Sequence, residues 1–159
     1  MRRVLLILPC NQCIRLGDFS VCSTWRRVIR SVGDLIAAGV VELAAMEICK
    51  PGILIHGEER WYTACNIYPS WERFKRSPYL LDVLVDGVAR DLRWLAARYD
   101  AIAYYINVKA FRIAIERASR EVGVEVVDLG PPEANLIAFS KYLGGLRGKL
   151  ESLAGSRPL

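Results

Sequence analysis

The sequence of 159 residues is poor in several residue types and has no long apolar run. It holds one His, one Gln, two Thr and five Lys beside 17 Arg. No apolar run approaches the roughly 18 residues that a membrane-spanning helix needs. The run at 4–8 has only five residues before Pro9, whereas the apolar core of a secretory signal has about 7–15. We therefore expect a cytoplasmic protein that does not associate with a membrane.

Two glycine-rich phosphate-binding motifs are also missing. Neither G-x-x-x-x-G-K-[ST] nor G-x-G-x-x-G occurs in the chain, which disfavours nucleoside triphosphates and dinucleotides as ligands. The nucleophile-elbow sequence of Ser-His-Asp hydrolases is absent as well. No cofactor can be assigned from the sequence.

What the chain does contain is enough apolar material for one core. Hydrophobic residues make up 53% and charged residues 25%, which excludes a disordered chain, and the length suits one domain. We expect a single domain over 1–154 and a flexible tail over 155–159.

The net charge of +5 permits nucleic-acid binding. Arginine in excess of lysine suits phosphate or carboxylate binding, although a GC-rich genome explains it equally well. The single Gln fits a thermophilic source.

Apolar runs and helical periodicities alternate along the chain. The run at 4–8, ended by Pro9, is typical of a buried strand. Ser23 or Thr24 can cap a following helix that Gly39 ends, and Pro78 is well placed in the first turn of the longest helix. We predict strands over 4–8, 40–48, 53–55, 101–106 and 124–129, and helices over 24–39, 78–95, 111–122 and 131–143, with a break near 144–145.

This alternation predicts an α/β fold. Because the strands are apolar on both faces, we expect a doubly wound, mostly parallel sheet of four or five strands with helices on both faces. Ligands of such folds bind beyond the carboxyl ends of the strands. The segments that follow strands are therefore the places to search for function: 9–23, 49–69, 107–109 and 130–135.

The segment 9–23 is rich in cysteine. It joins the first strand to the first helix, where backbone N–H groups favour anions and thiolates. Cys10 and Cys13 have the C-x-x-C spacing of a redox pair or of half a metal site, and Cys22 follows them. A metal would need a fourth ligand from Cys49, Cys65 or His56. Because a second C-x-x-C is absent, no metal site is assigned, and buried, unreactive thiols are a further alternative.

The segment 50–76 interleaves aromatic and basic residues. Flat rings stack on bases and cations bind phosphates, which is the combination that single-stranded or flipped nucleotides need. The rings can instead cap the sheet, with the charges solvated. Glu58 and Glu59 are a candidate acid–base pair or a charged turn. His56 either binds substrate or makes a local hydrogen bond. The interleaved residues are Trp61, Tyr62, Tyr68, Trp71 and Phe74 with Arg60, Arg73, Lys75 and Arg76.

Four of these features together resemble a known family over about residues 4–130. They are Leu6-Ile7-Leu8-Pro9-Cys10, Lys50-Pro51-Gly52, Glu58-Glu59 and Ile67-Tyr68-Pro69. A strand that ends in Pro-Cys, a Pro-Gly segment, a Glu and a Tyr-Pro are similar to the core domain of archaeosine synthase. That family acts on a 7-cyano-7-deazaguanine base in archaeal tRNA and attaches a nitrogen-donating amino acid at the nitrile.

The resemblance implies Cys10 as the thiolate that attacks the nitrile carbon and Glu58 or Glu59 as the group that moves protons. Substrate would be bound by Arg15, His56, Trp61 and Tyr68. The expected partners are tRNA or another nucleic acid and a subunit that supplies RNA-binding domains, and the resemblance implies an archaeal source.

The family's signature continues after Pro-Cys with a Lys-Pro-Tyr triplet, a Ser and a His. Here Ile14-Arg15-Leu16, Phe19 and Cys22 stand at those positions. The resemblance thus leaves two hypotheses, an active enzyme and a relative that has lost catalysis. Two further hypotheses come from the residues themselves: a thiol-redox or metal-binding protein that uses Cys10, Cys13 and Cys22, and a non-enzymatic module that binds RNA or protein.

Overall fold

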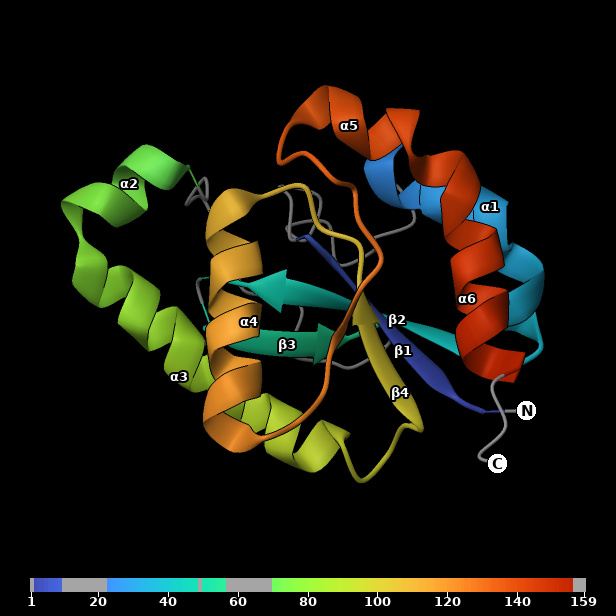
Figure 1. Cartoon of the computed structure of the whole chain (residues 1–159), viewed down its shortest axis with the longest axis horizontal. Helices are drawn as coiled ribbons and strands as arrows, with labels where there is room; N and C mark the ends of the chain where they lie inside the picture. Colours follow the sequence, from blue (N-terminus) through green and yellow to red (C-terminus); the bar gives the residue numbers. More distant parts are fainter. Residues whose placement is uncertain (1, 10–22, 49, 57–69, 156–159) are drawn as a thin grey trace.

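The computed structural model describes residues 2–9, 23–48, 50–56 and 70–155. Strands and helices alternate along these segments (Figure 1). The strands are β1 (Val4–Pro9), β2 (Val41–Glu47), β3 (Gly52–Ile55), β4 (Ala101–Tyr104) and β5 (Val127–Asp128). The helices are α1 (Ser23–Ala37), α2 (Trp71–Arg76), α3 (Pro78–Leu95), α4 (Lys109–Val122), α5 (Leu136–Lys141), the 3-10 helix η4 (Leu143–Gly145) and α6 (Leu146–Gly155).

The strands form one five-stranded sheet in the order β3-β2-β1-β4-β5. All neighbouring strands are parallel except β3, which runs antiparallel to β2. Val4 of the central strand β1 lies opposite Val41 of β2 and Ala101 of β4. All six residues of β1 are buried, as expected for a parallel strand covered on both faces. The predicted α/β class with a mostly parallel sheet is confirmed.

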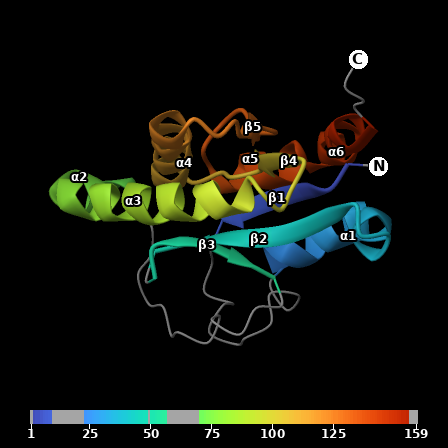
Figure 2. The same cartoon turned by 90° about the horizontal axis from the view of Figure 1, so that it is seen from below.

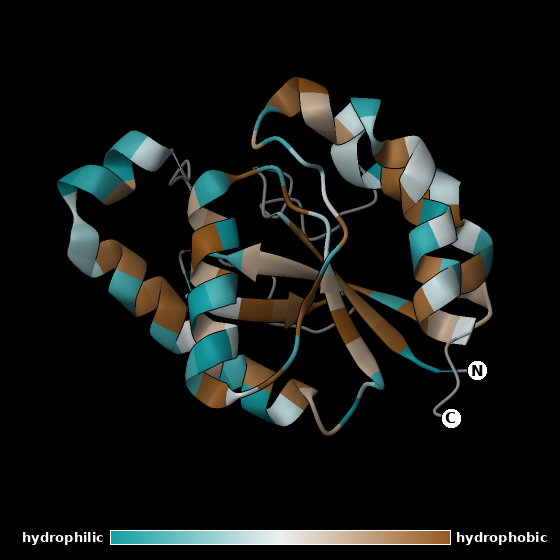
Figure 3. Ribbon diagram, viewed as in Figure 1, coloured by the Kyte–Doolittle hydropathy of each residue, from teal (hydrophilic) through white to brown (hydrophobic). Residues whose placement is uncertain are grey.

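Helices cover both faces of the sheet. Figures 1 and 2 show α2, α3 and α4 on one side, and α1, α5 and α6 on the other. The helix predicted over 78–95 forms as α3, and its apolar residues Leu84, Val88 and Leu92 are buried. Figure 3 shows the same pattern, with brown apolar residues turned toward the sheet and teal residues on the outer side of several helices. Within the described residues, no helix combines the length and the apolar character needed to cross a bilayer.

The turn between β2 and β3 explains the one antiparallel pair. Only four residues separate Glu47 from Gly52, which is too short for the crossover that a parallel neighbour requires. The chain therefore reverses, and Ile55 lies opposite Ala44.

Two segments differ from the helices that the sequence predicts: one helix forms where none is predicted, and another starts later than predicted. The helix α2 lies in a stretch where no clean periodicity predicts one; the Ser70 hydroxyl caps it by accepting a hydrogen bond from the Arg73 N–H at 3.4 Å. Toward the carboxyl terminus, the pair at 131–132 does not open a helix. The helix α5 starts after Asn135, whose side chain accepts from the Ala138 N–H at 2.8 Å. A side-chain cap thus sets each start.

Candidate ligand site at the carboxyl edge of the sheet

The strand order creates a switch point between β1 and β4. From β1 the chain passes through α1 to β2 on one side, while β4 begins the other half of the sheet. Loops that leave neighbouring parallel strands in opposite directions form the usual ligand site of open α/β sheets. Here that position lies beyond Pro9 of β1 and Tyr104 of β4 (Figure 1).

Backbone hydrogen bonds extend the sheet past the end of β4. The Tyr105 N–H donates to the Ile7 carbonyl at 3.0 Å, and the Ile106 N–H donates to the Gly130 carbonyl at 2.9 Å. The segment after β4 therefore stays fixed between β1 and the chain that follows β5. Its next residue, Asn107, stands at the carboxyl edge.

Asn107 is a buried polar residue at this edge. It is 8% exposed, and its Nδ2 donates to the Asn135 carbonyl at 3.2 Å. The carbonyl comes from the residue that caps α5, so the amide joins the ends of two loops. Buried polar groups require such partners. The sequence placed 107–109 and 130–135 among the segments to search, and the structure brings these two together.

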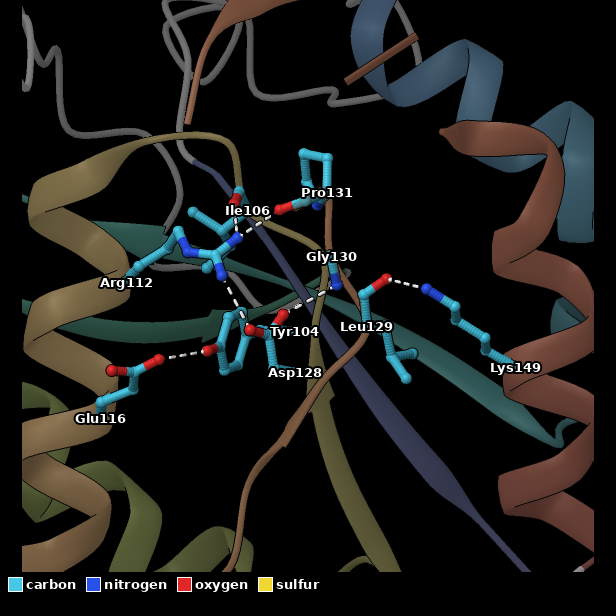
Figure 4. Close-up of polar contacts among 9 residues, drawn as sticks. All are labelled: Tyr104, Ile106, Arg112, Glu116, Asp128, Leu129, Gly130, Pro131 and Lys149. Carbon is cyan, nitrogen blue, oxygen red and sulfur yellow. Dashed lines mark hydrogen bonds and ion pairs between the residues drawn. The ribbon is translucent and has the colours of Figure 1, made fainter. Parts of the chain in front are cut away.

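Arg112 is the main link between the loops after β4 and β5 (Figure 4). One of its Nη atoms donates to the Ile106 carbonyl at 3.2 Å and to the Pro131 carbonyl at 2.6 Å, and the other pairs with Asp128 at 2.7 Å. Asp128 also accepts from the Gly130 N–H at 2.8 Å. A planar guanidinium suits this role because it offers several donors in a fixed geometry.

The other helical layer supports the same loop. Lys149 of α6 donates to the Leu129 carbonyl at 3.0 Å (Figure 4). Cations from both faces, Arg112 and Lys149, thus bind main-chain oxygens of the loop that carries the cis peptide between Gly130 and Pro131. Sequence reasoning did not single out either cation, because neither lies in a segment that follows a strand.

Two tyrosines at the end of β4 act as hydrogen-bond donors. The Tyr104 hydroxyl donates to Glu116 at 2.8 Å, and burial together with this bond raises the pKa of Tyr104 above its usual value. The Tyr105 hydroxyl donates to the Phe139 carbonyl at 2.5 Å, and burial raises its pKa to about 12. Both hydroxyls are therefore protonated at neutral pH and do not serve as bases.

Glu47 ends β2 as a second buried polar side chain near this edge. It is 2% exposed, and its Oε1 accepts from the Ile48 N–H at 2.9 Å. Its neighbour Met46 lies opposite Pro9, so a carboxylate stands one residue beyond the last paired position of β1. Sequence patterns did not single out Glu47, because a charged residue at the end of a strand is usually exposed.

The Pro-Gly segment after β2 is locked to α3. The Ile53 N–H donates to Asp91 at 2.8 Å, and Arg90 donates to the Pro51 carbonyl at 3.0 Å. A Cβ at Gly87 would lie 2.1 Å from the Pro51 carbonyl oxygen, so only glycine permits this approach. Packing against α3 therefore accounts for the Pro-Gly segment on which the family resemblance partly rests.

His56 is the one predicted site residue that the structure describes. It is exposed, its N–H donates to the Leu43 carbonyl at 2.8 Å, and its ring centroid lies 6.1 Å from that of Trp25. Trp25 in turn donates to the Pro9 carbonyl at 3.3 Å. Because β3 is antiparallel, His56 lies beside the middle of β2, four residues before the carboxyl end of that strand.

The other predicted site residues lie outside the described residues, so their placement stays a prediction. They are Cys10, Arg15, Glu58, Glu59, Trp61 and Tyr68, together with the remaining cysteines Cys13, Cys22, Cys49 and Cys65. Within 2–9, 23–48, 50–56 and 70–155, no group of three or more His, Cys, Asp or Glu side chains could hold a metal ion.

These features define a doubly wound α/β domain with polar side chains gathered at its switch point. No protein-family model matches the chain, and no curated protein matches it. Its fold is similar to that of AF0587, whose crystal structure is described as that of a protein of unknown function, with a TM-score of 0.54 and 15% sequence identity. The match covers 98% of this chain and 45% of AF0587. The chain thus spans less than half the length of that protein, and the likeness shows the fold alone.

Proposed function

We propose that this domain binds a deazaguanine base of an RNA at the carboxyl edge of the sheet and attacks its nitrile carbon with the thiolate of Cys10. The observation that carries the proposal is the position of β1: it ends with Pro9 at the switch point between β1 and β4, and Cys10 follows directly in the sequence. The Pro-Cys pair of the family resemblance thus continues from the strand end where α/β sheets bind ligands.

The chemistry is an addition to a carbon–nitrogen triple bond. The thiolate sulfur forms a bond to the nitrile carbon, one π-bond becomes a lone pair on nitrogen, and that nitrogen takes a proton, which gives a thioimidate. The amine of an amino acid then adds to the same carbon and the thiolate leaves, which gives an amidine. In the proposal Glu58 or Glu59 moves the protons, Arg15 neutralises anionic charge, and Trp61 and Tyr68 hold the base.

Described side chains at the edge support the choice of a guanine-like base. Such a base presents N–H donors on its pairing edge, and these need oxygen acceptors. The carboxylate of Glu47 ends β2, and the amide of Asn107 lies three residues after the end of β4. Both are buried, where hydrogen bonds discriminate most strongly between ligands. A reaction on tRNA would place the protein in the cytoplasm, and a partner subunit that supplies RNA-binding domains belongs to the proposal.

Intact-mass spectrometry of the denatured protein tests the reaction. The reduced full chain is incubated with the free nitrile-bearing base and, separately, with an RNA that contains it. We expect a mass increase of one base or one RNA, which Cys10→Ala abolishes and the matched variant Cys13→Ala retains. An unmodified mass with both substrates, while Cys10 still reacts with a small alkylating agent, would overturn the proposal. A native mass that includes a metal ion, held jointly by Cys10, Cys13 and Cys22, would replace the proposed reaction with a metal site.

A further inference from the structure

Helix α2 turns its cations outward and its Phe74 ring inward. Phe74 is 2% exposed and packs into the core, whereas Arg73, Lys75 and Arg76 are exposed. Figure 3 shows α2 largely in teal at the far end of its layer. Phe74 is therefore buried in the core and does not contact another surface.

The charge of α2 is not neutralised within the helix. Glu72 is its one acidic residue, and it pairs with Lys75 at 3.5 Å, while its carbonyl accepts from Arg76 Nε at 3.4 Å. Three cations and one anion leave α2 with a net charge of +2. Arg73 has no side-chain partner among the residues described here, so its guanidinium is open to an external anion.

Aromatic rings stand at both ends of this helix. Tyr79, in the first turn of α3, is 75% exposed. At the other end, Lys109 Nζ lies 4.6 Å from the ring centroid of Trp71. Lys109 begins α4, directly after the segment that follows β4. The α2 surface, formed by Trp71, Arg73, Lys75, Arg76, Tyr79 and Lys109, therefore extends to the carboxyl edge of the sheet.

We infer that the α2 surface binds single-stranded RNA, with its cations on phosphates and Tyr79 stacked on a base. Arginine forks bind phosphate oxygens with two donors, and exposed rings between cations are the platform on which unpaired bases stack. A membrane fits less well, because binding in the lipid interface needs an exposed apolar face beside the cations and Phe74 is buried. The inference rests on the proposed function in one respect, namely that a base of the same RNA enters the site. The RNA bound on the α2 surface would then be the single strand that flanks that base.

Fluorescence anisotropy with a short, labelled single-stranded RNA of ordinary bases tests the surface apart from the reaction. We compare wild type with the double variant Arg73→Ala/Arg76→Ala over a range of KCl concentrations. Each phosphate contact in a single strand contributes about 0.7 to the slope of log affinity against log salt. We expect the slope to fall by about 1.4 and the affinity to fall roughly tenfold or more.

The matched control removes the same charge from the same helical layer at the opposite edge of the sheet. Arg93→Ala/Arg120→Ala changes two exposed cations near the ends of α3 and α4, and we expect the slope to stay near the wild-type value. Tyr79→Ala should weaken binding about fivefold, as the loss of one stacked base predicts, and Tyr79→Phe should restore it.

Equal losses in the two double variants would overturn the inference, because they would show a general effect of charge. An equally large loss of binding to phosphatidylserine vesicles in Arg73→Ala/Arg76→Ala would overturn it in favour of a membrane. Failure of the Cys10 adduct together with normal RNA binding would refute the proposed function and leave the α2 surface standing. An adduct that forms unchanged on RNA in Arg73→Ala/Arg76→Ala would refute the surface and leave the reaction.

Discussion

The two edges of the sheet use their polar side chains differently. At the amino edge, side chains join β1 and β2 to the turn between α3 and β4: Arg3 forms an ion pair with Glu42 at 2.7 Å, Tyr99 donates to the same carboxylate, and Arg2 donates to the Asp100 carbonyl at 2.7 Å. At the carboxyl edge, Arg112 and Lys149 hold the loops that follow β4 and β5 beside the switch point.

The contacts at the amino edge join elements of the fold to one another, whereas those at the carboxyl edge position loops. Contacts at the amino edge join β1, β2 and the turn between α3 and β4, which lies at the edge opposite the switch point. Donors at the carboxyl edge satisfy loop carbonyls that would otherwise lack partners, and so fix the shape of the segments at the switch point. Binding residues of a rigid scaffold are generally carried by such loops.

The largest expected effect comes from a substitution where α3 closely approaches the turn after β2. In Gly87→Ala the new Cβ would lie 2.1 Å from the Pro51 carbonyl oxygen, and because both partners are backbone-bound, α3 or the turn must move. We expect the free energy of unfolding to fall by about 3 kcal/mol, measured by urea denaturation. The matched variant Gly33→Ala, with no atom within 4 Å, should instead gain about 0.5 kcal/mol. A gain in both variants would show that this contact does not hold the turn.

A smaller effect is expected when the link between the two carboxyl-edge loops is removed. Arg112→Ala leaves the Ile106 and Pro131 carbonyls and Asp128 without their donor, and we expect a loss of about 2 kcal/mol. Exchange of the Leu129 and Gly130 amide hydrogens should accelerate more than exchange in β1. Arg117→Ala on the same helix removes an exposed pair with Asp82 and should change stability by less than about 0.5 kcal/mol. Equal protection of Leu129 and Gly130 in both variants would contradict the positioning role.

The smallest effect concerns the amino edge and depends on pH. Burial acts to raise the pKa of Glu42, but the hydrogen bonds from Tyr99 and Arg3 outweigh it and hold that pKa below its usual 4.5. A lowered carboxyl pKa stabilises the fold above pH 4.5, and this stabilisation is lost as the pH falls through the lowered value. Because the pair is partly solvent-exposed, we expect Glu42→Gln to cost less than about 1 kcal/mol at pH 7.

The check is the slope of stability against pH between 5 and about 2.5, which Glu42→Gln should flatten and the exposed control Glu121→Gln should leave steep. An unchanged slope in Glu42→Gln would show that Glu42 has an ordinary pKa.

Patterns within single segments predicted much of the fold. The continuous apolar run of β1 and the helical spacing of apolar residues in α3 are both local patterns, and both elements form where these patterns indicate. The helix α2 escaped this reasoning because its start depends on one Ser70 cap and its burial on one ring, Phe74. The short β5, limited to Val127–Asp128, was predicted longer, because apolar composition does not say how many residues find a partner strand.

The candidate site was less accessible to such reasoning. Segments after strands could be ranked from the sequence, and Asn107 and Asn135 fall within two of them. Arg112 could not be found, because its role depends on three oxygens supplied by Ile106, Asp128 and Pro131. No local pattern records a contact between residues so far apart along the chain.

By itself the sequence determined the alternation of strands and helices, the burial of β1 on both faces and the surplus of arginine, because each follows from the order and chemistry of neighbouring residues. Only the tertiary structure decided that β4 pairs with β1, that β3 reverses, and that the cations Arg112 and Lys149 serve loop carbonyls. Those outcomes depend on which distant segments pack together, and close packing selects among arrangements that local preferences leave equal.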